Sequence, residues 1–168
     1  MNLIEEYDLN TKAFAQFIKE IADEDFNKKP EQSTWSAAEN VEHIIRSEFG
    51  TARLFNSDTK KEPNRDSESK IKEIKTRFTD RSKKLQAFGV VLPTDGPKNK
   101  EELISKFLSS REMVIQLVKE QDPDELCMKF EHPLFGYMTR REWIHFNMVH
   151  ANRHTQQIEA LLTSLNKI

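Results

Sequence analysis

The sequence of 168 residues is poor in the residue types that characterise disulfide-bonded, turn-rich or membrane-spanning proteins. Its single cysteine excludes an internal disulfide framework and a cysteine-rich zinc module. Four glycines and six prolines are too few for the frequent turns of a β-sandwich. The longest apolar stretch, residues 87–92, is far too short to span a bilayer. The net charge of -2 lacks the basic excess that is typical of nucleic-acid-binding proteins.

The first residues of the chain carry neither the basic nor the apolar segment of a signal peptide. We therefore expect no secretory leader, no membrane partner and a cytoplasmic location. Leu, Ile, Val and Phe together make up about a quarter of the chain, which is enough to bury a core.

What the chain does contain is helical periodicity, with apolar residues recurring three and four positions apart. Ser36 with Glu39 and Thr139 with Glu142 have the spacing of capping boxes, which predict two of the helix starts. The five predicted helices cover residues 9–25, 36–55, 71 to just before Gly89, 99–121, and 139 to nearly 167. We find no credible pair of strands. The pattern predicts one all-α domain, residues 1–168, built as an up-down four-helix bundle with an additional short helix or long inter-helix loops.

The last predicted helix has polar residues in the middle of an apolar seam. Alternating steps of four and three residues place six side chains on one face: Trp143, Asn147, His150, His154, Gln157 and Leu161. Residues four apart stand one above the other on a helix, so His150 and His154 can converge on one metal ion. Asn147 and Gln157 would then be its hydrogen-bonding neighbours. The alternative is two core histidines bonded to the backbone or to nearby side chains.

Three further histidines are candidates for a third ligand. His145 is five residues before His150 and faces another side of the helix, so we interpret it as exposed or at the rim. His132 lies in a turn-rich aromatic loop and could reach the mouth of the bundle, although a histidine in a loop is more often solvent-exposed or bonded to the local turn. His43 lies away from the main apolar stripe of its helix, in a line of small or polar residues that includes Asn40. From spacing alone, this line of residues is either a solvent-exposed face of the helix or the wall of a polar pocket, and spacing favours the exposed face.

Two blocks of sequence resemble the DinB-like family, whose members are also described as metal-dependent hydrolase bundles. The first is WSAAENVEHI at 35–44. The second comprises HPLFG at 132–136, Trp143 and HANRHTQQI at 150–158, in the order that the family shows. The resemblance implies a four-helix bundle in which one histidine of the second helix and two of the last helix bind a divalent metal. Carried over to this chain, the ligands are His43, His150 and His154, and the metal is zinc, nickel or iron.

Three neutral imidazoles leave a divalent ion with its full charge and an open position, as in catalytic sites. The H-E-x-x-H glutamate is missing, which argues against a zincin-type protease, and no catalytic residue is identified. Arg153 would suit an anionic substrate, or is a surface arginine. Three acids of the second helix, Glu39, Glu42 and Glu48, are expected to be solvated or capping. Cys127 is expected to be buried and inert.

The family includes transferases that use a low-molecular-weight thiol, so the resemblance implies activation of such a thiol for transfer to a small substrate. Activation of water for hydrolysis is the second enzymatic hypothesis. The alternative class is a non-catalytic bundle that binds metal or a small ligand. Relatives of this kind often form homodimers, and no exposed stripe here decides that question.

The charged segment 57–81 departs from the family pattern and leaves the shape of the site entrance open. Residues 60–84 hold ten Lys or Arg against five acids. The charges interleave on a helix with a narrow apolar stripe and no aromatic residues suited to stacking on bases. This pattern indicates a solvated face, and we expect no nucleic-acid partner.

Overall fold

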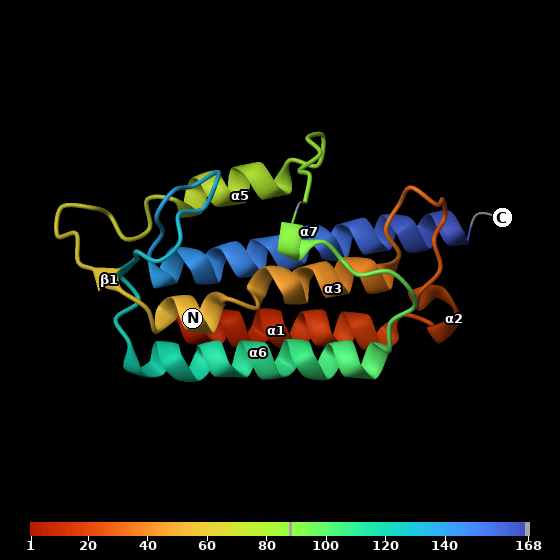
Figure 1. Ribbon diagram of the computed structural model, residues 1–168, viewed down its shortest axis with the longest axis horizontal. Coiled ribbons are helices and arrows are strands. Elements are labelled where there is room, and N and C mark those ends of the chain that lie inside the picture. The colour runs from red at the N-terminus through yellow and green to blue at the C-terminus, as the bar shows by residue number, and fades with distance from the viewer. Residues whose placement is uncertain (88, 167–168) are drawn as a thin grey trace.

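The computed structural model describes residues 1–87 and 89–166, and four long helices packed side by side make up most of it (Figure 1). The long helices are α1 (Leu3–Glu20), α3 (Ala37–Glu48), α6 (Lys100–Glu120) and α7 (Arg140–Leu165). The shorter helical elements are α2 (Asp23–Phe26), α4 (Thr51–Phe55), α5 (Ile71–Thr79) and a 3-10 turn, η1 (Gly89–Val91). The predicted four-helix bundle is confirmed.

The long connection between α3 and α6 determines the order of helix directions. α5 lies within this connection and packs along α7. It returns the chain to the end of the bundle at which α3 starts, and α6 begins at that end (Figure 1). α3 and α6 therefore run in the same direction, opposite to α1 and α7. The order is up-down-down-up rather than simple alternation, and the crossover makes it possible.

Side-chain caps determine where several helices begin. The hydroxyl of Ser36 accepts the N–H of Glu39 at 3.1 Å, and the Glu39 carboxylate accepts the N–H of Ser36 at 2.8 Å. Thr139 and Glu142 form the same reciprocal pair, with distances of 3.1 and 2.9 Å. Both predicted capping boxes are therefore present. α1 begins earlier than expected, because Asn2 opens it with a third capping box.

Several helix ends differ from the prediction. The helix predicted over 36–55 is interrupted at Gly50, a poor helix former, and α4 follows as a separate element. The next helix ends at Thr79 rather than near Gly89, and Arg153 binds the backbone carbonyls at its end. α1 ends at Glu20, and α2 is separate from it. α7 extends to Leu165, and the predicted end near Lys167 lies outside the described residues.

A small antiparallel strand pair, which the sequence did not predict, ties two loops together. β1 (Thr59–Lys60) pairs with β2 (Leu126–Cys127). Strands of two residues are too short to leave a period-two signal in the sequence.

The core consists of two hydrophobic clusters with a polar layer between them. Phe55 and Trp143 belong to one cluster, and Ile18 and Phe107 belong to the other. On α6 and α7 the change from one cluster to the other falls at Arg111 and at His150. The buried members of the polar layer include Glu48 of α3, Arg111 of α6, and Asn147, His150 and His154 of α7. Buried polar groups need partners, so this layer contains the positions with specific chemistry.

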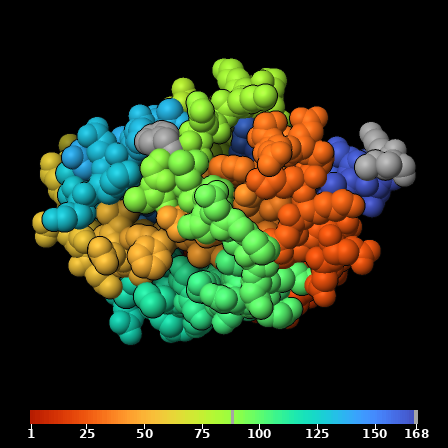
Figure 2. Space-filling view, turned by 45° about the vertical axis from the view of Figure 1, so that its right-hand side comes forward, coloured from red at the N-terminus to blue at the C-terminus, as the bar shows by residue number. Residues whose placement is uncertain are grey.

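Chain segments outside the bundle cover this layer. α5 packs on α7, and the segment that contains η1 crosses the outer surface of α3 (Figure 2). Within residues 1–87 and 89–166, no helix combines the length and apolarity that crossing a bilayer requires.

Candidate metal centre

Three buried histidines converge in the polar layer. His43 comes from α3, and His150 and His154 come from consecutive turns of α7. Their relative exposures are 5%, 7% and 5%. One nitrogen from each ring lies within 4.8 Å of the others, and the Nε2 atoms of His43 and His150 are 3.1 Å apart. The structure thus brings together the three predicted histidines in an arrangement that could hold a metal ion.

The hydrogen bonds behind two of the rings orient their free nitrogens inward. Nδ1 of His43 donates to the backbone oxygen of Val91 at 2.8 Å. Nδ1 of His154 donates to Oδ1 of Asn40, also at 2.8 Å. These acceptors assign the proton to Nδ1, because a carbonyl oxygen cannot donate, and leave the Nε2 lone pair of each ring facing the cluster.

The spacing and the donor atoms fit a divalent ion. Zinc–nitrogen bonds of about 2.0–2.1 Å at tetrahedral angles separate two ligand nitrogens by about 3.3 Å, close to the 3.1 Å between His43 and His150. Without an ion, two facing lone pairs would repel, so His150 must carry its proton on Nε2. In that form its buried Nδ1 is an acceptor, and it has no hydrogen-bond partner among the described residues. A divalent ion bound by all three Nε2 atoms would replace this arrangement.

Burial keeps the three imidazoles neutral. It lowers the pKa of His43, and the bond to Val91 opposes this shift in part. Burial, followed by the neighbouring His154 and His43, lowers the pKa of His150 well below 6.5. Burial, followed by His43, lowers the pKa of His154 to about 3. At pH 7 all three rings are therefore in the form that binds a metal cation.

Aromatic side chains surround the cluster. The ring of Trp35 is centred 5.1 Å from that of His43. Phe78 and Phe146 lie 5.5 and 5.4 Å from the ring of His150. Phe78 belongs to α5, so the charged segment 57–81 contributes an apolar wall to the site. This arrangement excludes bulk water from the imidazoles.

Similarity to known proteins agrees with this geometry. A family model described as the DinB superfamily matches residues 6–158, which is most of the chain. The chain belongs to the DinB superfamily.

Two other proteins are similar over nearly their whole length. The uncharacterized protein YuaE of Bacillus subtilis (strain 168) is 26% identical over 156 residues, which cover 89% of this chain and 91% of YuaE. The crystal structure of TT2238, a four-helix bundle protein, matches with a TM-score of 0.58 and 16% identity. That match covers 94% of this chain and 96% of TT2238 and supports the fold alone.

The four polar residues predicted around the DinB site have different surroundings. Asn40 contacts a histidine directly, and its own amide is oriented by donation from Nδ2 to the Ser36 oxygen at 2.9 Å. Asn147 instead lies in another network, where its Nδ2 donates to the Tyr7 hydroxyl at 3.2 Å. Gln157 is half-buried, nearly one helical turn beyond His154. Of the four, Asn40 is the residue whose side chain holds a histidine of the cluster.

Arg153 is not the surface arginine that one sequence interpretation allowed. It is buried, with 5% relative exposure. Nη1 donates to the oxygens of Phe78 and Asp80 at 3.1 and 3.2 Å, and Nη2 donates to the oxygen of Lys83 at 2.9 Å. Its guanidinium therefore binds the C-terminal end of α5, where a positive charge interacts favourably with the helix dipole.

The remaining two histidines lie outside the cluster. The ring of His132 packs against Phe135 and Phe146 at 4.9 and 5.0 Å, and its Nδ1 accepts the N–H of Leu134. It is half-buried and bonded to its local turn, which was one of the two expected situations for a loop histidine, and burial lowers its pKa to about 4. His145 is half-buried, which agrees with its predicted place at the rim.

The acids of α3 are all engaged elsewhere. Glu39 caps the helix as expected and pairs with Lys29 at 2.9 Å. Glu42 accepts hydrogen bonds from the backbone and hydroxyl of Thr94, both at 2.9 Å. Glu48 was expected to be solvated or capping, but it is buried with 3% exposure in an ion pair with Arg111. The prediction that Cys127 is buried is confirmed by its 0% exposure, and burial raises its pKa to about 12.

The sequence interpretation missed Arg111, which is fully buried. Its Nε and Nη2 donate to the Glu48 carboxylate at 2.6 and 2.7 Å, and its guanidinium lies 4.3 Å from the Tyr7 ring centre. A signal was present, because Arg111 stands between Phe107 and Val114 on the apolar face of its helix.

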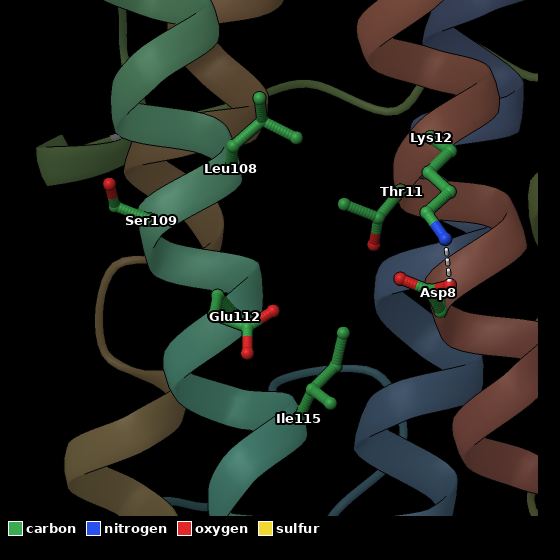
Figure 3. Close-up of a pocket in the computed structure, with 7 residues that line it drawn as sticks. All are labelled: Asp8, Thr11, Lys12, Leu108, Ser109, Glu112 and Ile115. Atoms are coloured by element: carbon green, nitrogen blue, oxygen red, sulfur yellow. Dashed lines mark hydrogen bonds and ion pairs between the residues drawn. The ribbon is translucent and has the colours of Figure 1, made fainter.

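A surface groove of about 400 Å³ lies between α1 and α6 (Figure 3). It is lined by Asp8, Thr11, Lys12, Leu108, Ser109, Glu112 and Ile115. Lys12 and Asp8 form an ion pair across consecutive turns of α1. None of the three clustered histidines lines this groove, so the chemistry of the DinB site is elsewhere.

Proposed function

We propose that this protein binds one divalent metal ion, zinc, nickel or iron, through His43, His150 and His154. We further propose that it is a metal-dependent enzyme that activates a low-molecular-weight thiol or water for reaction with a small substrate. The observation that carries the proposal is the convergence of three buried, neutral imidazoles whose Nε2 atoms face one another.

The surrounding residues support each part of such a site. Val91 and Asn40 hold two rings by their Nδ1 atoms, so that their Nε2 atoms stay directed inward. Trp35, Phe78 and Phe146 shield the cluster from water. A divalent ion with three neutral ligands keeps its positive charge and an open position, where a thiol or water becomes more acidic.

The source of a reactive thiol follows from the state of the chain's own cysteine. Cys127 has no exposed surface and its pKa is raised to about 12, so it stays protonated and out of reach. A thiol used in the reaction would therefore be supplied by a small molecule. Glu39, Glu42 and Glu48 are committed to other partners, so the metal would lower the pKa of the bound thiol or water and the proton would pass to solvent or to the substrate.

Low exposure also supports a second candidate, a bundle that binds metal or a small ligand without catalysis. The histidines are 5–7% exposed, and the hydrogen bond of 3.1 Å between His43 and His150 would stabilise them even without an ion. Turnover distinguishes the two candidates. We would screen cellular thiols against an electrophilic acceptor, and an absence of metal-dependent acceleration with every thiol would favour hydrolysis or the non-catalytic candidate.

Metal analysis tests the proposal directly. Untagged protein purified without chelators should contain close to one divalent ion per chain. His43→Ala, His150→Ala and His154→Ala should each remove it, while the matched control His145→Ala, half-buried on another side of α7, should retain it. Full occupancy in folded His43→Ala protein would refute the three-histidine assignment.

We also propose a cytoplasmic protein that does not bind nucleic acid or membranes and forms a homodimer. Several cations of the basic segment pair with acids of this chain, such as Arg65 with Glu142 at 2.8 Å, which supports the absence of a nucleic-acid partner. Light scattering of the purified protein measures the oligomeric state.

A further inference from the structure

Two arginines stand close to the clustered histidines in sequence and fold. Arg46 follows His43 by three residues on α3, and Arg153 directly precedes His154 on α7. Both bind the chain that covers the site. Arg46 Nε donates to the oxygen of Val90 at 2.8 Å, next to the Val91 oxygen that holds His43. Arg153 binds three carbonyl oxygens at the end of α5.

Neither guanidinium is neutralised by an ion pair. Their hydrogen-bond acceptors are uncharged backbone oxygens, and no carboxylate of residues 1–87 and 89–166 lies within ion-pair distance of Arg46 or Arg153. An arginine remains charged at neutral pH. Two full positive charges are therefore bound to the segments that cover the histidines.

Nearby acids do not cancel these charges. Glu39 pairs with Lys29 at 2.9 Å, and Glu42 pairs with Lys98 at 3.3 Å. Burial lowers the pKa of Arg153, Asp80 raises it and so offsets part of the charge, and Arg81 adds a further cation beside it. The guanidinium of Arg153 lies 5.9 Å from the ring centre of Phe78, and that ring is 5.5 Å from the ring of His150, so one aromatic side chain separates this charge from the cluster.

We propose that the histidine cluster receives a small ligand of net negative charge, and that Arg46 and Arg153 select it. This inference rests on the proposed metal site, since the ligand would occupy the open position of the ion. A positive potential focused by aromatic, poorly polarisable walls raises the local concentration of anions and disfavours cations. Because the arginines are fixed by the covering chain, their charges need no reorganisation when the ligand binds.

Three thiols of similar size and different charge test the selection. The cobalt(II)-loaded protein would be titrated with mercaptopropionate, mercaptoethanol and cysteamine, and binding followed by the sulfur-to-cobalt charge-transfer absorption. We expect the anionic thiol to bind at least about tenfold more tightly than the cationic one, with the neutral thiol between them, as unpaired charges in a partly buried site predict. Added salt should reduce the difference.

Matched variants assign the effect to the two arginines. Arg46→Gln and Arg153→Gln retain a donor for the backbone oxygens and remove the charge, so each should lower the preference for the anion, while Arg46→Lys should restore it. Arg53→Gln, an exposed arginine of α4, removes the same charge and should leave the preference unchanged. If Arg153→Gln fails to fold, the half-buried Arg46 still provides the test.

The outcomes separate this inference from the proposed function. Equal affinities for the three thiols on stoichiometric cobalt(II) protein would overturn the anion selection and leave the metal site intact. A preference that survives in Arg46→Gln and Arg153→Gln would overturn the assignment to these residues. Failure of the wild-type protein to bind cobalt(II) through its histidines would overturn the proposed function and this inference together.

Discussion

Replacing Glu48 by Gln should strongly destabilise the bundle, because it leaves the charge of Arg111 buried without a counterion. Arg111 has 0% exposure and Glu48 has 3%. The carboxylate accepts two hydrogen bonds from Arg111, at 2.6 and 2.7 Å. A glutamine amide has nearly the same shape, but it offers one acceptor, and its NH₂ group would face a guanidinium N–H donor.

The expected cost follows from the loss of one partner of a buried pair. Breaking such a pair costs about 3–5 kcal/mol, even where the intact pair contributes little, because the remaining charge is desolvated. In a chain of this size that loss corresponds to a decrease in Tm of roughly 6–20 °C. Three other acceptors, on Asn10, Thr11 and the Asn147 backbone, keep Arg111 in place and do not supply the missing charge.

Urea denaturation followed by circular dichroism measures the effect. The matched control is Asp8→Asn, which makes the same chemical change in the exposed pair with Lys12 and should alter the free energy of unfolding by less than about 1 kcal/mol. The double variant Glu48→Leu with Arg111→Met removes both charges and should be more stable than Glu48→Gln. A loss below about 1 kcal/mol for Glu48→Gln would refute this reasoning.

Three further predictions concern single side chains. Asn40→Ala should weaken zinc affinity by about 10–100-fold in a chelator competition, since His154 loses the acceptor that fixes its proton; unchanged affinity would contradict this role. Cys127 should react with a thiol reagent at pH 8 only as fast as the protein unfolds, because burial raises its pKa to about 12; rapid labelling of folded protein would show that the thiol is accessible. His132 should destabilise the fold as pH falls from 6.5 towards 4. In this range the imidazole is protonated in the unfolded chain but stays neutral in the folded chain, where its pKa is about 4. The stability of His132→Phe should therefore fall less than that of wild type over this range, and parallel curves would contradict the assignment.

Local interactions made several structural features predictable. The capping boxes at Ser36 and Thr139 join residues three apart, and both helices begin where these pairs place them. His150 and His154 are one turn apart on one helix, so their shared face follows from helix geometry alone. Where a helix end lay against a distant partner, as at Thr79 next to the carbonyls bound by Arg153, periodicity overestimated the helix length.

The position of His43 illustrates what spacing alone could not decide. Spacing favoured a solvated face for the line that contains Asn40 and His43, yet both are buried. α3 is covered on that side by α7 and by the segment with η1, so it buries more than one apolar stripe. The resemblance to the DinB-like family, rather than periodicity, identified His43 as a member of the cluster. For the same reason, spacing could not show that Asn40 contacts His154 whereas Asn147 contacts Tyr7.

By itself, the sequence determined the helical class, most helix starts and the paired histidines of the last helix, because each depends on residues within one or two turns. The tertiary structure alone decided which polar groups meet. It placed Val91 behind His43, Arg153 at the end of α5 and Arg111 against Glu48, through contacts between residues 48 to 75 positions apart. Such contacts form only when helices pack, and packing leaves buried polar groups with the partners that lie within reach.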